Sequence, residues 1–228
     1  MQKTSVINEF PYIVVSGNMG TGKTTLINLM SYHLDCRILN EPVLDNPYIE
    51  DYYRDMGKWA FHYQHYFLGY RANQLLKLGS QSDLILSDRC VYEDADVFAN
   101  GLHKDSMISD RDYKAYRMTY EVIEKCLPKP KLLIYLHAPA EVLMNRIASR
   151  NISSEINGVG ITYLQRFNER YENWISEFNL CPVLRVNTEI NNFLVDGKFV
   201  KSIAEEVKKA IGNIKEVKHE RCAQTRLP

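Results

Sequence analysis

The sequence lacks the features that mark membrane, disulfide-stapled and polyanion-binding proteins. Its 28 basic and 28 acidic side chains cancel, so no net charge attracts a nucleic acid or a membrane surface. No apolar stretch approaches the ~20 residues that a membrane-spanning helix requires. The five cysteines are widely spaced and include no C-x-x-C pair, so neither a disulfide framework nor a zinc site is indicated. The expected substrate is therefore a small molecule.

Targeting and linker signals are missing as well. The first ten residues show neither the apolar core nor the cleavage pattern of a signal peptide, and a cytoplasmic location is expected. There is no internal repeat and no low-complexity linker. A chain of 228 residues that is 45% apolar fits a single domain over residues 1–228. The polar tail over residues 213–228 is expected to be disordered.

Short apolar runs alternate with longer helical patterns along the chain. Strands are expected at residues 12–16, 36–39, 84–87, 132–136 and 183–186. Helices are expected at residues 22–34, 59–79, 110–127, 139–150, 160–178 and 198–212. This alternation predicts an α/β fold with a doubly wound parallel sheet and helices on both faces. Ligands of such sheets bind at the carboxyl ends of the strands.

A phosphate-binding loop follows the first predicted strand and opens the first predicted helix. Its pattern is G-x-x-x-x-G-K-[ST], in which backbone N–H groups and the helix N-terminus receive phosphate oxygens. Lys23 is expected to reach the outer phosphates, and Thr24 to ligate Mg²⁺. A GTPase would also need an N-K-x-D motif, which is missing from this sequence. The expected ATP-binding residues of the loop are Gly17, Asn18, Met19, Gly20, Thr21, Gly22, Lys23, Thr24 and Thr25.

Charged residues follow the next two predicted strands. Glu41 is placed to accept a proton from an attacking hydroxyl, although, taken alone, it is better explained as a surface acid before a proline. Asp88 is placed to hold Mg²⁺, and Arg89 to offset charge on a transferred phosphoryl group. The alternative interpretation is that Asp88 and Arg89 form an ion pair that caps the end of the strand. Their coincidence with a phosphate-binding loop favours the catalytic interpretation.

Two further pairs of polar residues fall on helical spacing. Gln64 and Arg71 are seven residues apart and share a helix face, which is either solvated or presented to the edge of a base. Arg146 and Arg150 end a predicted helix, where they either complement the helix dipole or clamp ATP phosphates. The Ser-, Asn- and Gly-containing stretch that follows is expected to be a mobile lid over about residues 150–160.

Together these residues resemble the deoxynucleoside kinase family, which contains deoxycytidine, deoxyguanosine and mitochondrial thymidine kinases and their bacterial relatives. The resemblance covers roughly residues 10–180, and residues 88–94 (D-R-C-V-Y-E-D) carry much of it. Asn46 stands where animal members usually have tryptophan, so the pattern is more similar to bacterial purine deoxynucleoside kinases. The resemblance implies a five-stranded parallel sheet, a homodimer, and ATP with Mg²⁺ as the phosphoryl donor.

The resemblance also implies catalytic roles. Glu41 is similar to the general base that activates the 5′-hydroxyl of the nucleoside. Arg89 is similar to the arginine that stabilises both this base and the phosphoryl transfer, and Lys23 completes the catalytic set. Thr24 and Asp88 are the implied metal ligands, with Asp88 replacing the glutamate that is common in animal members.

Nucleoside-binding roles follow from the same resemblance. Gln64 is similar to the residue that reads the base edge, and Arg71 and Asp94 to a charged pair beside the base. Tyr53 and Glu155 are similar to residues that contact the sugar 3′-hydroxyl. Because the Asp94 carboxylate only accepts hydrogen bonds, it favours a base with an exocyclic amine. We expect deoxyadenosine first, deoxyguanosine and deoxycytidine next, and thymidine last.

Two other functions share parts of this pattern. A nucleoside-monophosphate kinase of the thymidylate kinase type also has a P-loop and an Asp-Arg strand end, but needs a basic pocket for the acceptor's phosphate. An ATP-binding regulatory protein would need only the loop, and the intact Lys23, Thr24, Glu41 and Asp88 argue against it.

Overall fold

The computed structural model describes residues 11–41, 45–78, 83–149, 160–191, 193 and 196–224, with side chains described up to residue 212. Within this part of the chain, no helix combines the length and apolar character needed to cross a membrane.

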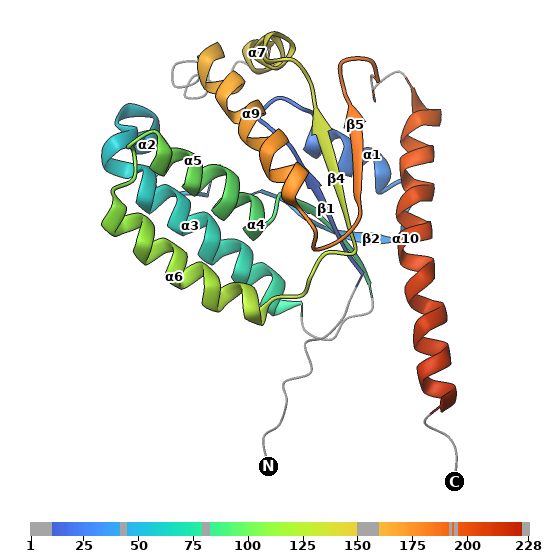
Figure 1. Cartoon of the computed structure of the whole chain (residues 1–228). Coiled ribbons are helices and arrows are strands. Elements are labelled where there is room, and N and C mark those ends of the chain that lie inside the picture. The colour runs from blue at the N-terminus through green and yellow to red at the C-terminus, as the bar shows by residue number, and fades with distance from the viewer. Residues whose placement is uncertain are drawn as a thin grey trace, which may run out of the picture.

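Five parallel strands form one sheet in the order β2-β3-β1-β4-β5 (Figure 1). Val15 of the central strand β1 pairs with Asp88 of β3 on one side and with Ile134 of β4 on the other. The predicted α/β class and the five parallel strands are confirmed. The strands are β1 (Tyr12–Ser16), β2 (Cys36–Leu39), β3 (Leu84–Asp88), β4 (Leu132–His137) and β5 (Val183–Asn187).

Helices cover both faces of the sheet, as the alternating pattern predicted (Figure 1). One face carries α1 (Lys23–Met30) and α10 (Gly197–Gln224). The other carries α2 (Ile49–Arg54), α3 (Met56–Lys77), α4 (Val91–Glu93), the π-helical η1 (Asp94–Ala99), α5 (Asn100–Lys104), α6 (Asp110–Cys126) and α9 (Ile161–Glu177). Helix α7 (Ala140–Ser149) follows β4 and packs against α9.

The three central strands β1, β3 and β4 are buried along nearly their whole length because both of their faces are covered. Along β1, Tyr12 and Val14 pack into the core beneath α3, η1, α6 and α9, whereas Ile13 and Val15 pack into the core beneath α1 and α10. All four side chains are at most 1% exposed. Burial of one such aliphatic side chain stabilises the fold by about 1.5–3 kcal/mol.

Three regions differ from the sequence prediction. The short helix α2 was not predicted, and neither was the helical run α4-η1-α5, which begins three residues after Asp88. Helix α10 ends at Gln224, although the pattern predicted its end at residue 212 and a disordered tail from residue 213. Acidic residues at positions 93, 94 and 96 make the segment after β3 look like a loop. The charge partners of Asp94 and Asp96 come from α3 and α6, whereas Glu93 pairs with Arg89 of the same segment.

Candidate active site

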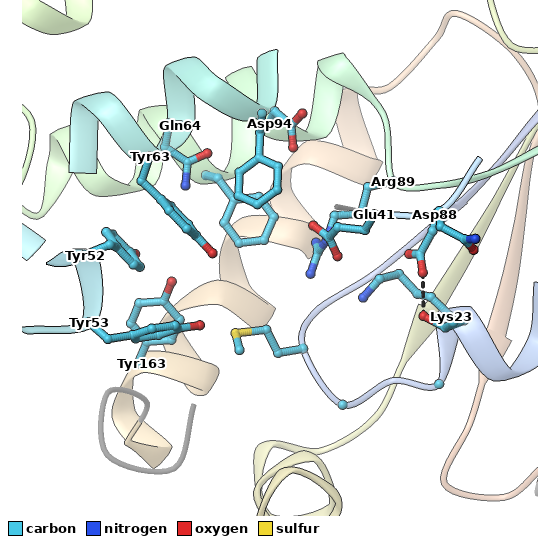
Figure 2. A pocket seen from close by; sticks show the side chains of 17 residues that line it. Lys23, Glu41, Tyr52, Tyr53, Tyr63, Gln64, Asp88, Arg89, Asp94 and Tyr163 are labelled. Atoms are coloured by element: carbon cyan, nitrogen blue, oxygen red, sulfur yellow. Dashed lines mark hydrogen bonds and ion pairs between the residues drawn. The ribbon is translucent and has the colours of Figure 1, made fainter. Parts of the chain in front are cut away.

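A cavity of about 220 Å³ opens at the carboxyl ends of β1, β2 and β3, between the phosphate-binding loop and helices α2, α3 and α9 (Figure 2). One end is formed by the loop and the other by a group of aromatic side chains. A single space therefore joins the predicted phosphate site to the predicted base site. The lining residues are Met19, Gly20, Gly22, Lys23, Thr24, Asn40, Glu41, Tyr52, Tyr53, Tyr63, Gln64, Phe67, Asp88, Arg89, Asp94, Phe98 and Tyr163.

The loop between β1 and α1 has a backbone that depends on glycine. Gly17, Gly20 and Gly22 have φ values of 142°, 81° and 92°, which L-residues with a side chain rarely adopt. A Cβ atom on Gly17 would lie 2.3 Å from the Leu136 carbonyl oxygen. The loop is thus wrapped tightly against β4, and the N-terminus of α1 points at the cavity, as anion binding requires.

Lys23 is buried at the floor of the cavity and is held by the loop itself. Its Nζ donates to the carbonyl oxygens of Gly17 at 3.0 Å and Asn18 at 3.1 Å. Burial, followed by the nearby charge of Arg89, lowers the pKa of Lys23 to about 8. A bound phosphate would offer the ammonium group better partners than these carbonyls, so the side chain is poised for an anion.

Thr24 and Asp88 form the part of the site that suits a divalent cation. The Thr24 hydroxyl donates to Asp88 Oδ2 at 2.5 Å, while the buried Asp88 Oδ1 has no hydrogen-bond partner. Burial raises the pKa of Asp88, because nothing in contact with Oδ1 compensates for its desolvation. A hydroxyl and a carboxylate with an unsatisfied oxygen fit Mg²⁺, which prefers oxygen ligands and retains several waters.

Charges of alternating sign connect the two ends of the cavity. Arg71 donates from Nε to Asp94 at 2.6 Å, from Nη2 to Glu41 at 2.9 Å, and from Nη1 to the Asp88 carbonyl oxygen at 2.8 Å. Arg89 Nε donates to the other side of Glu41 at 2.9 Å. The sequence-predicted residues Glu41, Arg71, Arg89 and Asp94 therefore meet in one network, and the Arg71–Asp94 pair is present in it.

The two acids of this network respond differently to burial. Burial favours the neutral form of Glu41, but Arg89, Arg71 and Lys23 together outweigh it and lower its pKa to about 2. Burial raises the pKa of Asp94 to about 6 against the opposing charge of Arg71. At neutral pH both carboxyl groups are ionised, and Glu41 has the lower pKa of the two.

The far end of the cavity is aromatic, with one amide among the rings (Figure 2). Tyr52 and Tyr63 stack at 4.1 Å between ring centroids with an interplanar angle of 3°. Gln64 is only 3% exposed, lines the cavity and makes no side-chain hydrogen bond to any described residue. The Gln64 amide is not among the buried polar atoms that lack a partner, so it is open to the cavity and can hydrogen-bond to a ligand with a matching edge.

Other predicted residues have different outcomes. Tyr53 lines the cavity from α2. Arg146 lies beside the loop, where it donates to the Gly20 carbonyl oxygen at 3.5 Å and to Thr188 at 2.9 Å. Arg150, Glu155 and the predicted lid, apart from Gly160, fall outside the described residues.

Several site residues escaped the sequence analysis. Tyr52, Tyr63, Phe98 and Tyr163 line the cavity, and Glu93 lies directly behind it in contact with Arg89. Tyr63 adjoins the predicted Gln64, and Glu93 lies inside the D-R-C-V-Y-E-D segment, so both had a local signal. Tyr163 had none, because its place depends on how α9 packs against α7 and η1.

The fold and the cavity together define a P-loop kinase with a second substrate site that faces the phosphate cradle. The profile of the family described as "Deoxynucleoside kinase" matches residues 13–212. The chain therefore belongs to the deoxynucleoside kinase family and is a phosphotransferase of nucleotide salvage. Members of this family use ATP with Mg²⁺ and bind deoxynucleosides as substrates.

Named relatives support this assignment. The chain is 36% identical over 202 residues to the deoxyadenosine/deoxycytidine kinase of Bacillus subtilis, covering 87% of this chain and 92% of that protein. It is 34% identical over 188 residues to a deoxyadenosine kinase of Dictyostelium discoideum, covering 82% and 75% of the two chains. A solved structure of deoxyadenosine kinase from M. mycoides with bound dATP superimposes with a TM-score of 0.73 at 29% identity, covering 86% and 97% of the two chains.

Proposed function

We propose that this enzyme transfers the terminal phosphoryl group of ATP to the 5′-hydroxyl of deoxyadenosine, with deoxyguanosine and deoxycytidine as poorer acceptors. The observation that carries the proposal is the single cavity in which Glu41 lies between the phosphate-binding loop and the unpartnered Gln64. An acceptor whose base meets Gln64 extends its 5′-hydroxyl toward Glu41 and the loop.

In the proposed reaction, Glu41 holds the acceptor hydroxyl and takes its proton. The oxygen forms a bond to the γ-phosphorus as the bond from that phosphorus to the β,γ-bridging oxygen breaks, and ADP leaves with the electron pair. The low pKa of Glu41 suits a loose transition state, in which the proton moves late and the carboxylate chiefly orients the hydroxyl. Arg71 and Arg89 keep the carboxylate ionised and in place.

Lys23 and Arg89 supply the positive charge for phosphoryl transfer. They are the only cationic side chains among the described residues that line the cavity. Mg²⁺, when bound with ATP at Thr24 and Asp88, would neutralise charge on the β- and γ-phosphates. Arg146 and Arg150 are proposed to hold ATP phosphates from the edge of the loop. No further cation for a phosphate on the acceptor lines the cavity within the described part of the chain, which argues against a monophosphate kinase.

Base preference is proposed to depend on Gln64 and Asp94. Asp94 lines the cavity, and its Oδ1 accepts no hydrogen bond from any described residue, so it can receive one from an exocyclic amine. The sequence analysis considered that Arg71 could donate to guanine O6. Arg71 is 3% exposed and is engaged by Glu41, Asp94 and the Asp88 carbonyl, which supports the proposal of adenine ahead of guanine.

Sugar contacts and assembly complete the proposal. Tyr53 and Glu155 are assigned to the 3′-hydroxyl of the acceptor. A homodimer is proposed to form through the outer faces of the adjacent helices α3 and α6. Leu76, Met118 and Val122 are 57%, 63% and 65% exposed there, which is unusual for large apolar side chains on neighbouring helices. Light scattering would show twice the chain mass, and Val122→Lys would reduce it to that of one chain.

The experiment that tests the proposed function is an initial-rate assay with ATP·Mg²⁺ and a panel of acceptors. The panel contains deoxyadenosine, deoxyguanosine, deoxycytidine, thymidine and deoxyadenosine monophosphate. We expect kcat/KM to be highest for deoxyadenosine and lowest for thymidine, with no product from the monophosphate. A higher kcat/KM for thymidine than for deoxyadenosine would overturn the assignment of Asp94, and phosphorylation of the monophosphate alone would overturn the function.

A further inference from the structure

Glu93 is a fully buried carboxylate directly behind the active site. It is 0% exposed and does not line the cavity. Its Oε1 accepts from Arg89 Nη1 at 2.6 Å and from the Tyr171 hydroxyl, and its Oε2 accepts from the Ser16 hydroxyl at 2.7 Å. These partners come from three different elements, β1, the end of β3 and α9, so the carboxylate is fixed from several directions.

Arg89 is consequently held along one edge of its guanidinium group. Nη1 donates to Glu93, to the Tyr171 hydroxyl at 2.8 Å and to the Gly17 carbonyl oxygen at 3.3 Å, while Nε donates to Glu41. Nη2 donates to no described residue, although Arg89 lines the cavity. Figure 2 shows the Arg89 side chain reaching toward Lys23 and the loop. One nitrogen of the fork is thus left for the reacting phosphoryl group.

The backbone of Arg89 is strained. Its φ is 69°, in the left-handed region that residues with a Cβ adopt only at a cost of about 1–2 kcal/mol. Such a backbone conformation persists only where the surrounding structure determines it, and it is frequent at functional sites. A buried ion pair contributes little net stability, because desolvation of both charges offsets their attraction. The arrangement is better explained by orientation of Arg89 than by stabilisation of the fold.

We propose that Glu93 is a positioning residue for phosphoryl transfer. Seated by Tyr171 and Ser16, its carboxylate fixes Arg89 Nη1, so that Nε faces Glu41 and Nη2 faces the site where the phosphoryl group passes. Neither the carboxylate nor the Tyr171 hydroxyl touches a substrate. The inference rests on the proposed function, since it takes Arg89 as the residue that stabilises the transfer.

The test compares Glu93→Gln with Glu172→Gln in the full-length enzyme. Glu172 is a matched control, because its carboxylate also accepts from a tyrosine, Tyr135 at 3.0 Å, and an arginine, Arg185 at 2.7 Å, but lies outside the cavity. Glutamine at position 93 keeps the shape and weakens the hold on Nη1. We expect kcat to fall about 10- to 100-fold, which is the usual loss of rate when a catalytic group is misplaced. The KM values for ATP and deoxyadenosine should stay within about threefold of wild type.

Titration of ATP separates positioning from a loss of folded protein. The number of ATP sites per chain counts the folded enzyme, so that kcat can be expressed per folded site. If Glu93→Gln releases Arg89, kcat per folded site falls while both KM values stay close to wild type. Glu172→Gln should leave kcat per folded site unchanged. A kcat per folded site within about threefold of wild type for Glu93→Gln would overturn the proposal.

Tyr171→Phe decides the question if Glu93→Gln does not fold. It removes one donor from Glu93 and one partner of Nη1, and Tyr135→Phe is its control. We expect Tyr171→Phe to lower kcat about three- to tenfold, as loss of one hydrogen bond does, with no effect of Tyr135→Phe. Equal effects of the two variants would contradict the proposal. If wild-type enzyme phosphorylates no deoxynucleoside, the proposed function fails; if it does so and both site variants match it, only the role of Glu93 fails.

Discussion

The two ends of the active-site cavity are built in different ways. The phosphate end is one contiguous segment, residues 17–24, whose shape is set by glycine backbone angles and by the start of α1. The acceptor end takes side chains from the end of β2, from α2, α3 and η1, and from α9. Its geometry depends on a chain of buried ion pairs from Asp94 through Arg71 and Glu41 to Arg89. In the proposed function, the first end binds the phosphates of ATP, which are common to all reactions of the enzyme, and the second end selects the acceptor.

This difference has a measurable consequence. Changes at the phosphate end should lower activity by the same factor for every deoxynucleoside, because the donor is shared. Changes at the acceptor end should alter the ranking of deoxynucleosides. The following predictions use that contrast, beginning with the largest expected effect.

Replacement of Lys23 should have a large and uniform effect. Lys23→Ala removes the buried ammonium group at the base of the loop. We expect kcat to fall about 10²- to 10³-fold, which is the usual effect of removing one preorganised donor that stabilises charge in a transition state. The same factor should apply to deoxyadenosine, deoxyguanosine and deoxycytidine. Steady-state kinetics with the three acceptors measure it, and a factor that differs tenfold between acceptors would break the contrast between the two ends.

Replacement of Asp94 should change selectivity more than rate. Asp94→Asn gives the base site a donor where it had only acceptors, so an exocyclic amine loses its partner and the thymine O4 gains one. We expect the kcat/KM ratio of deoxyadenosine to thymidine to fall about 10- to 100-fold, the effect of about 1–3 kcal/mol. Competition between the two nucleosides in one reaction measures the ratio directly. An unchanged ratio with a lower rate for both would show that Asp94 does not read the base.

Binding of ATP should weaken above about pH 8. The pKa of Lys23 is about 8 in the free enzyme, and phosphate oxygens favour its charged form, so the bound enzyme has a higher pKa. Between these two values ATP binding takes up a proton, and Kd rises by up to about tenfold per pH unit. Titration of ATP at pH 7, 8 and 9 measures this rise. Lys23→Ala should show a flat profile, and a flat profile in wild type would contradict the assignment.

Removal of the Tyr163 hydroxyl should have the smallest effect. Tyr163→Phe keeps the ring that closes the acceptor end and removes one polar group that lines the cavity. We expect KM for deoxyadenosine to rise about two- to tenfold, as for one hydrogen bond, with KM for ATP unchanged. An equal rise in KM for deoxyadenosine and KM for ATP would indicate that Tyr163 contacts both substrates, and would contradict the separation of the cavity into two ends.

The phosphate end was largely predictable from the sequence. Strand β1 was predicted at residues 12–16 and is observed at Tyr12–Ser16, because an unalternating apolar run is typical of a strand covered on both faces. The loop followed from its motif, since glycine positions and Lys23 lie within eight consecutive residues. Local sequence was sufficient to predict both strand β1 and the phosphate-binding loop, and the structure adds the distances between their atoms.

The acceptor end was predictable only in part. Glu41, Gln64, Arg71, Arg89 and Asp94 were found through their spacing and the family resemblance, and they meet as expected. The segment after β3 was not predicted to be helical, because its acids resemble loop residues and two of them, Asp94 and Asp96, are neutralised by Arg71 of α3 and Arg117 of α6. The helical structure of this segment depends on contacts with residues that are distant in the sequence, and a single sequence does not reveal which residues make contact.

The measurement that tests the central claim most directly is the turnover of Glu41→Gln. Glutamine keeps the size of the side chain and removes the carboxylate that lies between Arg71 and Arg89. The account predicts that kcat with deoxyadenosine falls about 10²- to 10⁴-fold, the usual contribution of a general base, while Kd for ATP stays within about threefold of wild type. Turnover near the wild-type rate would contradict it and show that Glu41 is not the base.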